Sequence, residues 1–132
     1  MTKRAKARTG ITALSPADES LARVRGTKMN TVYHVYEPGK LKPIVGAVDW
    51  PKKPTYDDIK ALTRQHIDGW LEHVTVLFEG KRCDMLVDED GLLKHLPLNE
   101  AATRIYWTMS GATSGSPIVG TAILFPERRI WF

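Results

Sequence analysis

The sequence has little of what disulfide-rich, membrane-spanning and zinc-binding proteins depend on. Cys83 is the only cysteine among 132 residues, which excludes an intramolecular disulfide and a zinc site built from several thiolates. No apolar run approaches the roughly 20 residues that cross a bilayer, and the basic start is not followed by the apolar core of a secretory signal. We therefore expect a cytoplasmic protein without a membrane contact.

Known catalytic and metal-binding motifs are also missing. The four histidines do not have the H-E-x-x-H spacing of zinc proteases. Residues 111–115, GATSG, match neither a nucleophile elbow nor a phosphate-binding loop. The acidic residues Asp84, Asp88, Glu89 and Asp90 are close in sequence, but the glutamate that completes a calcium loop is absent. We expect no cofactor, no metal and no catalytic residue, and a solvated turn accounts for these acids.

What is present is ordinary globular composition with an uneven distribution of charge. Hydrophobic residues make up 42% and charged residues 26% of the chain, enough to build one domain with a core. Residues 1–28 hold seven basic and two acidic residues, a net charge of +5, whereas residues 29–132 hold twelve against thirteen, a net charge of −1. The sequence therefore predicts a basic N-terminal extension over 1–28 and a single domain over 29–132.

The extension allows more than one interpretation. Lys3, Arg4, Lys6 and Arg8 form a basic arm that can bind nucleic-acid phosphates through counterion release, or that is simply a solvated tail. Helix-start residues at 15–18 and a glycine at position 26 predict a short helix between them. Because Met29 immediately precedes the first expected strand, translation starting at Met29 is a further alternative.

Residues 29–132 show the patterns of an α+β domain with an antiparallel sheet of five or six short strands. A helix is expected from the capping sequence at Thr55 to a stop at Gly69, and a second one after Pro97 with Asn99 as its cap. In the hairpin of 70–78 and 82–88, alternation places Cys83 on one face and Asp84 on the other. The expected strands cover 31–37, 44–48, 70–78, 82–88, 92–96 and 118–125.

Several of these segments carry a family resemblance. They are YEPG at 36–39, TYDDI at 55–59, VDEDGLLKHLPLN at 87–99 and IVGTAIL at 118–124. Over about residues 32–125 the chain resembles a family of small domains of unknown function found mainly in bacteriophages, prophages and mobile elements. The resemblance implies an α+β fold and a location in the bacterial host cell, and it supplies no catalytic residues. The basic extension and the last five residues depart from the family pattern.

Candidate binding residues follow from residue type and position. Trp50 lies between charged residues and prolines in a loop that we expect to be partly exposed. His95 and Asn99 lie in the part that is most specific to the family, and His95 would form a proton-transfer pair if Asp88 or Asp90 came near it. Arg128, Arg129, Trp131 and Phe132 combine arginine with aromatic rings, the types that anchor interfaces or stack on bases.

Function is expected to be non-enzymatic. We expect an accessory protein that binds a host protein, for example as an inhibitor of a defence or gene-expression factor. The alternative is a nucleic-acid-binding accessory protein that uses the basic arm, and a small-ligand binder or hydrolase ranks lower. For Trp131 and Phe132 the competing interpretation is that they fold back over the sheet, since large exposed apolar patches are rare on monomers.

Overall fold

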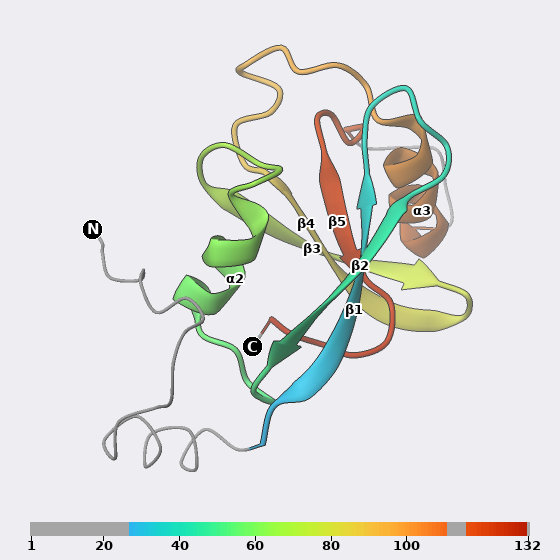
Figure 1. Ribbon diagram of the computed structural model, residues 1–132. Coiled ribbons are helices and arrows are strands. Elements are labelled where there is room, and N and C mark those ends of the chain that lie inside the picture. The colour runs from blue at the N-terminus through green and yellow to red at the C-terminus, as the bar shows by residue number, and fades with distance from the viewer. Residues whose placement is uncertain (1–26, 111–115, 132) are drawn as a thin grey trace.

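The computed structural model describes residues 27–110 and 116–131, so the expected N-terminal helix and basic arm lie outside the described residues. One antiparallel sheet contains five strands in the order β2-β1-β5-β4-β3 (Figure 1). The expected α+β class and strand number are confirmed. The strands are β1 Met29–Tyr36, β2 Ile44–Trp50, β3 Leu71–Phe78, β4 Lys81–Asp88 and β5 Ala122–Phe125, and the helices are α2 Tyr56–Thr63 and α3 Glu100–Ser110.

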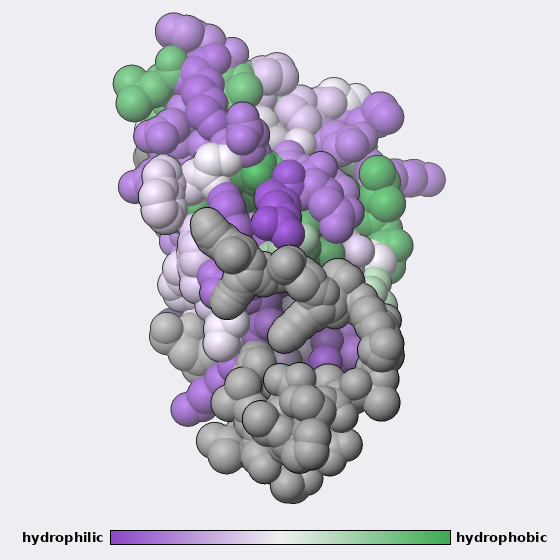
Figure 2. Space-filling model, turned by 60° about the vertical axis from the view of Figure 1, so that its left-hand side comes forward, coloured by the Kyte–Doolittle hydropathy of each residue, from purple (hydrophilic) through white to green (hydrophobic). Residues whose placement is uncertain are grey.

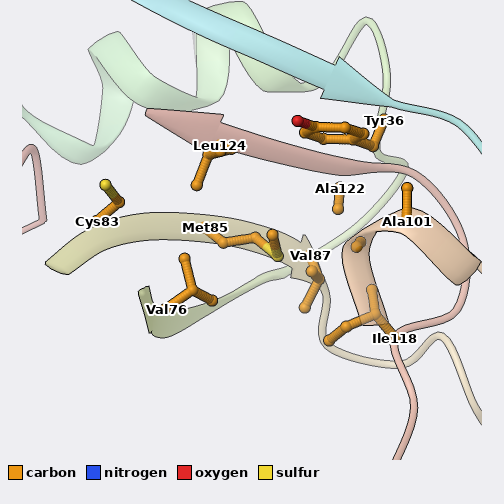
Figure 3. Close-up of a cluster of buried hydrophobic side chains, with 10 residues drawn as sticks. Tyr36, Val76, Cys83, Met85, Val87, Ala101, Ile118, Ala122 and Leu124 are labelled. Atoms are coloured by element: carbon orange, nitrogen blue, oxygen red, sulfur yellow. The ribbon is translucent and has the colours of Figure 1, made fainter. Parts of the chain in front are cut away.

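Apolar side chains are buried on both faces of the sheet, because alternate residues of its central strands point to opposite sides. On one face, Met85 and Leu124 pack in a cluster with Ala101 and Ala102 of α3; Figure 3 shows side chains from β4 and β5 reaching toward Ala101. On the other face, Leu86 and Ile123 pack with residues of α2 and of the C-terminal segment. The two helices therefore cover opposite faces (Figure 1).

The β3–β4 hairpin forms as the alternation predicts. Val76 pairs with Cys83 and Thr75 with Asp84, so the apolar positions face α3 and the polar ones face away from it. The connecting residues Glu79 and Gly80 have φ values of 51° and 82°. Positive φ at both positions gives the type of tight turn whose twist matches the flanking strands.

Helix α2 begins where the sequence predicts but ends earlier. The Thr55 hydroxyl accepts a hydrogen bond from the Asp58 backbone N–H, and the Asp58 carboxylate accepts one from the Thr55 N–H, which completes a capping box. The helix stops at Thr63 and not near Gly69. The chain then tightens into a turn in which the Ile67 N–H bonds to the Thr63 carbonyl, and Ile67 enters the core.

The expected strand over 92–96 is wrong. Residues 89–95 form successive turns, in which the Lys94 N–H bonds to the Asp90 carbonyl and the His95 N–H to the Leu92 carbonyl. The Asp88 carboxylate accepts a bond from the Asp90 N–H, and this local contact curls the chain before a second strand can pair. The chain therefore leaves β4 through a series of turns, and no strand forms over 92–96.

The last strand is shorter than the expected 118–125. Gly120 has a φ of 77°, and a Cβ atom there would lie 2.7 Å from Leu96 Cδ1. Only a glycine allows this conformation and this close approach, and the kink confines regular pairing to residues 122–125. Before the kink, Val119 forms an isolated bridge with Leu98, which joins the turn segment to the sheet.

Because of the strand directions, several segments that precede or follow strands lie at one end of the sheet. Strands β1 and β4 finish at the end that points up in Figure 1, and β2, β3 and β5 start there. We call this the upper end. It carries the β1–β2 connection 37–43, the start of β3 and the turn segment 89–98.

Candidate functional site

A dense polar cluster surrounds Asp84, in the middle of β4 and beside the end of β5. This carboxylate is fully buried. Its Oδ1 accepts hydrogen bonds from His73 Nε2 and Arg129 Nε, both at 2.7 Å. Its Oδ2 accepts bonds from the backbone N–H groups of Ile130 at 2.6 Å and Trp131 at 3.0 Å. One carboxylate from β4 therefore binds three consecutive residues of the C-terminal segment.

These bonds set the ionisation of Asp84. Burial alone raises the pKa of a carboxyl group, but the bonds from the Ile130 N–H, His73, the Trp131 N–H and Arg129 together outweigh it, so the pKa of Asp84 is lowered. The charged form is thus the stable one. Because each donor is a group of this chain, the arrangement fastens the C-terminal segment to the sheet.

The C-terminal aromatic and arginine residues complete this attachment. The Trp131 ring stacks on the His73 ring, with centroids 5.3 Å apart and planes within 5°. Arg128 donates hydrogen bonds to the Thr31 hydroxyl and to the carbonyl oxygens of Pro51 and Lys52. Trp131 and Arg128 therefore contact the domain, and for Trp131 this is what the competing interpretation expects; Phe132 lies outside the described residues.

The structure corrects the expected exposure of Trp50. The sequence predicts partial exposure, but only 5% of Trp50 is exposed, and its ring lies 5.6 Å from that of Phe125. The prolines that follow do not form a separate exposed loop around it. Instead Trp50 ends β2 and turns into the core beside α2, where a large aromatic residue contributes burial.

Asn99 is buried and serves as the expected cap of α3. Its Oδ1 accepts a hydrogen bond from the Ala102 N–H, and its Nδ2 donates bonds of 2.8 Å to the carbonyl oxygens of Tyr36 and Gly120. The amide therefore joins the start of α3 to the end of β1 and the kink before β5. With no exposed surface and all these bonds within the chain, its role in the structure is architectural.

His95 is exposed at the upper end, with a φ of 56°. Asp88, one of the two acids that would pair with His95 if they came near it, has another partner: its Oδ2 accepts a 2.8 Å bond from Lys94 Nζ, which also donates to the Asp68 carbonyl. The imidazole and carboxylate pair that does form is His73 with Asp84. Across the described part of the chain, no group of three or more His, Cys, Asp or Glu side chains is placed to hold a metal ion.

Exposed apolar side chains gather at the upper end. Of the nine large hydrophobic residues that are exposed in the described ranges, only Met29 and Tyr56 lie elsewhere. Figure 2, which keeps the vertical axis of Figure 1, shows hydrophobic residues among hydrophilic ones at this end. The seven are Leu41, Ile44, Val45, Trp70, Leu92, Leu93 and Leu98.

Backbone contacts fix part of this surface in place. The Glu89 N–H bonds to the Trp70 carbonyl, and the Gly120 N–H bonds to the Pro97 carbonyl. The turn segment 89–98 is thereby fixed between the start of β3 and the kink before β5. We call Leu41, Trp70, Leu92, Leu93 and Leu98 the apolar loops.

A pocket of about 390 Å³ opens beside the apolar loops. Its walls include Pro38, Ile67, Leu96 and Pro97, with the paired Lys94 and Asp88 at one side. This volume is within the range of about 300–1,000 Å³ that is typical of ligand pockets. An apolar side chain of a bound protein would fit this pocket.

Sequence reasoning missed both the Asp84 cluster and the apolar loops. His73 and Asp84 lie directly diagonal across the β3–β4 hairpin, since Thr75 is the residue opposite Asp84. That register is predictable from the tight turn. The contribution of Arg129 from 45 positions away is not a local signal. Leu92 and Leu93 of the apolar loops were missed because 92–96 was expected to form a strand.

Comparisons with known proteins give a family and nothing more specific. The chain belongs to the family described as a domain of unknown function, DUF3846, whose model matches residues 29–128. No curated protein and no solved structure matches the chain. No helix in the described ranges is long and apolar enough to cross a membrane.

Proposed function

We propose that the protein is a non-enzymatic binding protein and that its apolar loops contact another protein. One observation carries this proposal: seven of the nine exposed large hydrophobic side chains of the described residues lie at the upper end, beside a pocket of about 390 Å³. Large apolar side chains that gather in the exposed part of a small domain are characteristic of interaction sites. Burial of the leucine and tryptophan side chains there by a partner lowers the free energy of the complex, because it removes apolar surface from water.

The polar chemistry of the domain supports binding more than catalysis. Asp84 and Asn99 are fully buried, and their side chains form their hydrogen bonds with groups of this chain. A general acid or base needs a site within hydrogen-bond reach of a substrate proton. Asp88, one of the two acids that line the pocket, is engaged by Lys94.

We further propose that the chain is an accessory protein of a bacteriophage or mobile element and that its partner is a host protein in the bacterial cytoplasm. Inhibition of a defence or gene-expression factor is one form of this role. The support is the resemblance of the segments at 36–39, 55–59, 87–99 and 118–124 to a family found mainly in such elements.

Affinity capture from a bacterial host tests the proposal. The tagged chain should retain one protein in stoichiometric amount, and Leu93→Glu and Leu98→Glu should each lose it, because a charge replaces an apolar contact. Met29→Glu is the matched control, since Met29 is also exposed but lies at the opposite end. Retention by both loop variants, or equal loss by the control, would contradict a contact through the apolar loops.

The nucleic-acid alternative makes a different prediction. Residues 29–132 have a net charge of −1, so binding would depend on the basic arm. Replacing Lys3, Arg4, Lys6 and Arg8 by glutamine should then abolish nucleic-acid binding, and wild-type binding should weaken steeply with salt. Binding that is insensitive to salt would exclude this mechanism.

A further inference from the structure

The outer edge of β2 is an unusual strand edge. Among the described strands, β2 pairs with β1 alone and ends the sheet. Its burial pattern is exposed or half-buried from Ile44 to Asp49, on both faces. A strand at the edge of a sheet presents unpaired N–H and C=O groups that can pair with another strand. We call residues 44–48 of this strand the β2 edge.

The β2 edge lacks the features that normally prevent such pairing. Its sequence, IVGAV, has no charge, no proline and three β-branched residues, and proteins usually protect edges with lysine, proline, a bulge or a covering element. The register with β1 is continuous from Met29 to Val35, without a bulge. The opposite edge strand, β3, differs because it carries the charged Glu72 and packs against α3.

Tyr33 supports the β2 edge from one face. It lies opposite Gly46, and a Cβ atom at Gly46 would be only 2.5 Å from the Tyr33 ring. The ring therefore lies over the glycine and extends toward the outer edge, the arrangement in which an aromatic residue compensates for a glycine in a strand. A side chain of an added strand next to Gly46 would contact this ring.

Charges flank the apolar centre. Lys42 precedes the strand and Lys52 follows it, and both side chains are exposed. Lys40, also exposed, pairs weakly with Glu37 at 3.8 Å. Asp49 is the only acidic residue in β2. An added segment would therefore gain from carboxylates at both ends and from apolar, β-branched residues between them.

We propose that the β2 edge binds an extended segment of a protein partner, apolar at its centre and acidic at its ends, as a sixth strand. This is strand addition, in which main-chain hydrogen bonds provide affinity and alternate side chains provide specificity. The proposal rests on the proposed function, and it extends the interaction surface of the upper end along Ile44 and Val45, which lie at that end and also on the β2 edge.

A synthetic peptide of about ten residues, long enough to pair with the strand, tests this with the full chain. Its centre alternates valine and threonine, and a glutamate pair stands at each end. Two further versions carry N-methyl groups on odd or on even amides. Only alternate N–H groups of an edge strand face its neighbour, so one methylated version should bind and the other should lose binding at least tenfold.

Variants of the protein complete the test. Val45→Lys should weaken the unmethylated peptide at least tenfold, although the added charge attracts glutamate. Leu93→Glu should bind the peptide as the wild type does. A version of the peptide with lysine in place of glutamate should bind more weakly. Amide hydrogen exchange should show new protection on binding at those alternate amides of residues 44–48 that point away from β1.

Four results would overturn strand addition: equal binding of both methylated peptides, unchanged binding by Val45→Lys, self-association that Val45→Lys abolishes without peptide binding, or protection in the free monomer of those amides of residues 44–48 that point away from β1. The third assigns the edge to a second copy and the fourth to another segment of the same chain. A captured host protein that Leu93→Glu loses and Val45→Lys keeps would leave the proposed function intact and refute only the strand addition.

Discussion

Replacement of Asp84 by asparagine tests whether one carboxylate holds the C-terminal segment on the sheet. Asparagine has nearly the same shape, so Asp84→Asn removes charge without leaving a cavity. Its single carbonyl oxygen can face the Ile130 and Trp131 N–H groups only if its NH₂ group faces Arg129, another donor. At least one of the four hydrogen bonds of Asp84 is then replaced by a contact between two donors.

The expected loss of stability depends on how exposed the hydrogen-bond partners of Asp84 are. Removing one member of a fully buried ion pair costs about 3–5 kcal/mol, but the Arg129 side chain is 42% exposed and can be rehydrated. The two backbone bonds to Asp84 are buried or part-buried, and bonds to a charged group contribute about 1.5–3 kcal/mol each. We expect Asp84→Asn to lower the free energy of unfolding by about 2–4 kcal/mol. Arg129→Ala should cost at most about 1 kcal/mol, because the partly exposed guanidinium is screened by solvent and Asp84 keeps its other three hydrogen bonds.

Urea unfolding measures both variants. With a slope of about 1–3 kcal/mol per molar urea for small domains, Asp84→Asn should move the midpoint by about 1 M or more, and Arg129→Ala by much less. Amide exchange should show loss of protection at Ile130 and Trp131 in Asp84→Asn. An unchanged midpoint for Asp84→Asn, or a larger effect of Arg129→Ala, would refute the reasoning, because the side-chain ion pair would then be the main attachment.

Further predictions concern other buried groups. The difference in unfolding free energy between wild type and Asp84→Asn should be constant from pH 5 to 8 and should shrink below about pH 4. A carboxyl group whose folded pKa is lowered stabilises the fold above its unfolded pKa of about 3.9, and it loses that contribution as the pH falls. Urea titrations at several pH values measure this difference. Asn99→Asp should destabilise by about 2–4 kcal/mol although aspartate is a good helix cap, because its carboxylate would face the carbonyl oxygens that Asn99 Nδ2 now bonds; equal stability by thermal unfolding would argue against those bonds. Gly120→Ala should cost about 1–3 kcal/mol from its positive φ and the contact with Leu96, with Gly39→Ala, a positive φ in open space, as the milder control. Cys83 should react with iodoacetamide only on unfolding, because it is buried and burial raises the pKa of its thiol; rapid alkylation of the folded chain would contradict its position in the core.

Local patterns predicted those elements whose chemistry is complete within a few residues. The alternation across 70–88 fixed the two faces of the β3–β4 hairpin, because a tight turn leaves no freedom of register. Thr55 and Asn99 were predicted as caps, because a side-chain oxygen beside free N–H groups needs no distant partner. These elements carry the α+β fold.

Distant partners decided the features that local patterns missed. Trp50 was expected in an exposed loop, but Phe125, 75 positions away, provides the apolar surface that buries it. The 92–96 segment has the apolar content of a strand, but the bond between the Asp88 carboxylate and the Asp90 N–H curls the chain before it can pair. His95 was considered as the partner of an acid, whereas His73 has that role because the hairpin and the C-terminal segment meet around Asp84.

The polar and charged residues of this sequence that are candidates for chemistry therefore stabilise its architecture. Asp84 fastens the C-terminal segment, Asn99 joins α3 to two strands, and Lys94 with Asp88 fixes the turn segment. These contacts hold the C-terminal segment, the start of α3 and the turn segment in place on the sheet. The exposed leucines and the β2 edge therefore lie on a rigid frame. A rigid apolar surface loses little conformational entropy when a partner binds. Substitutions that distinguish function from stability should consequently be made in the apolar loops and along the β2 edge, whereas substitutions of the polar residues should unfold the frame first.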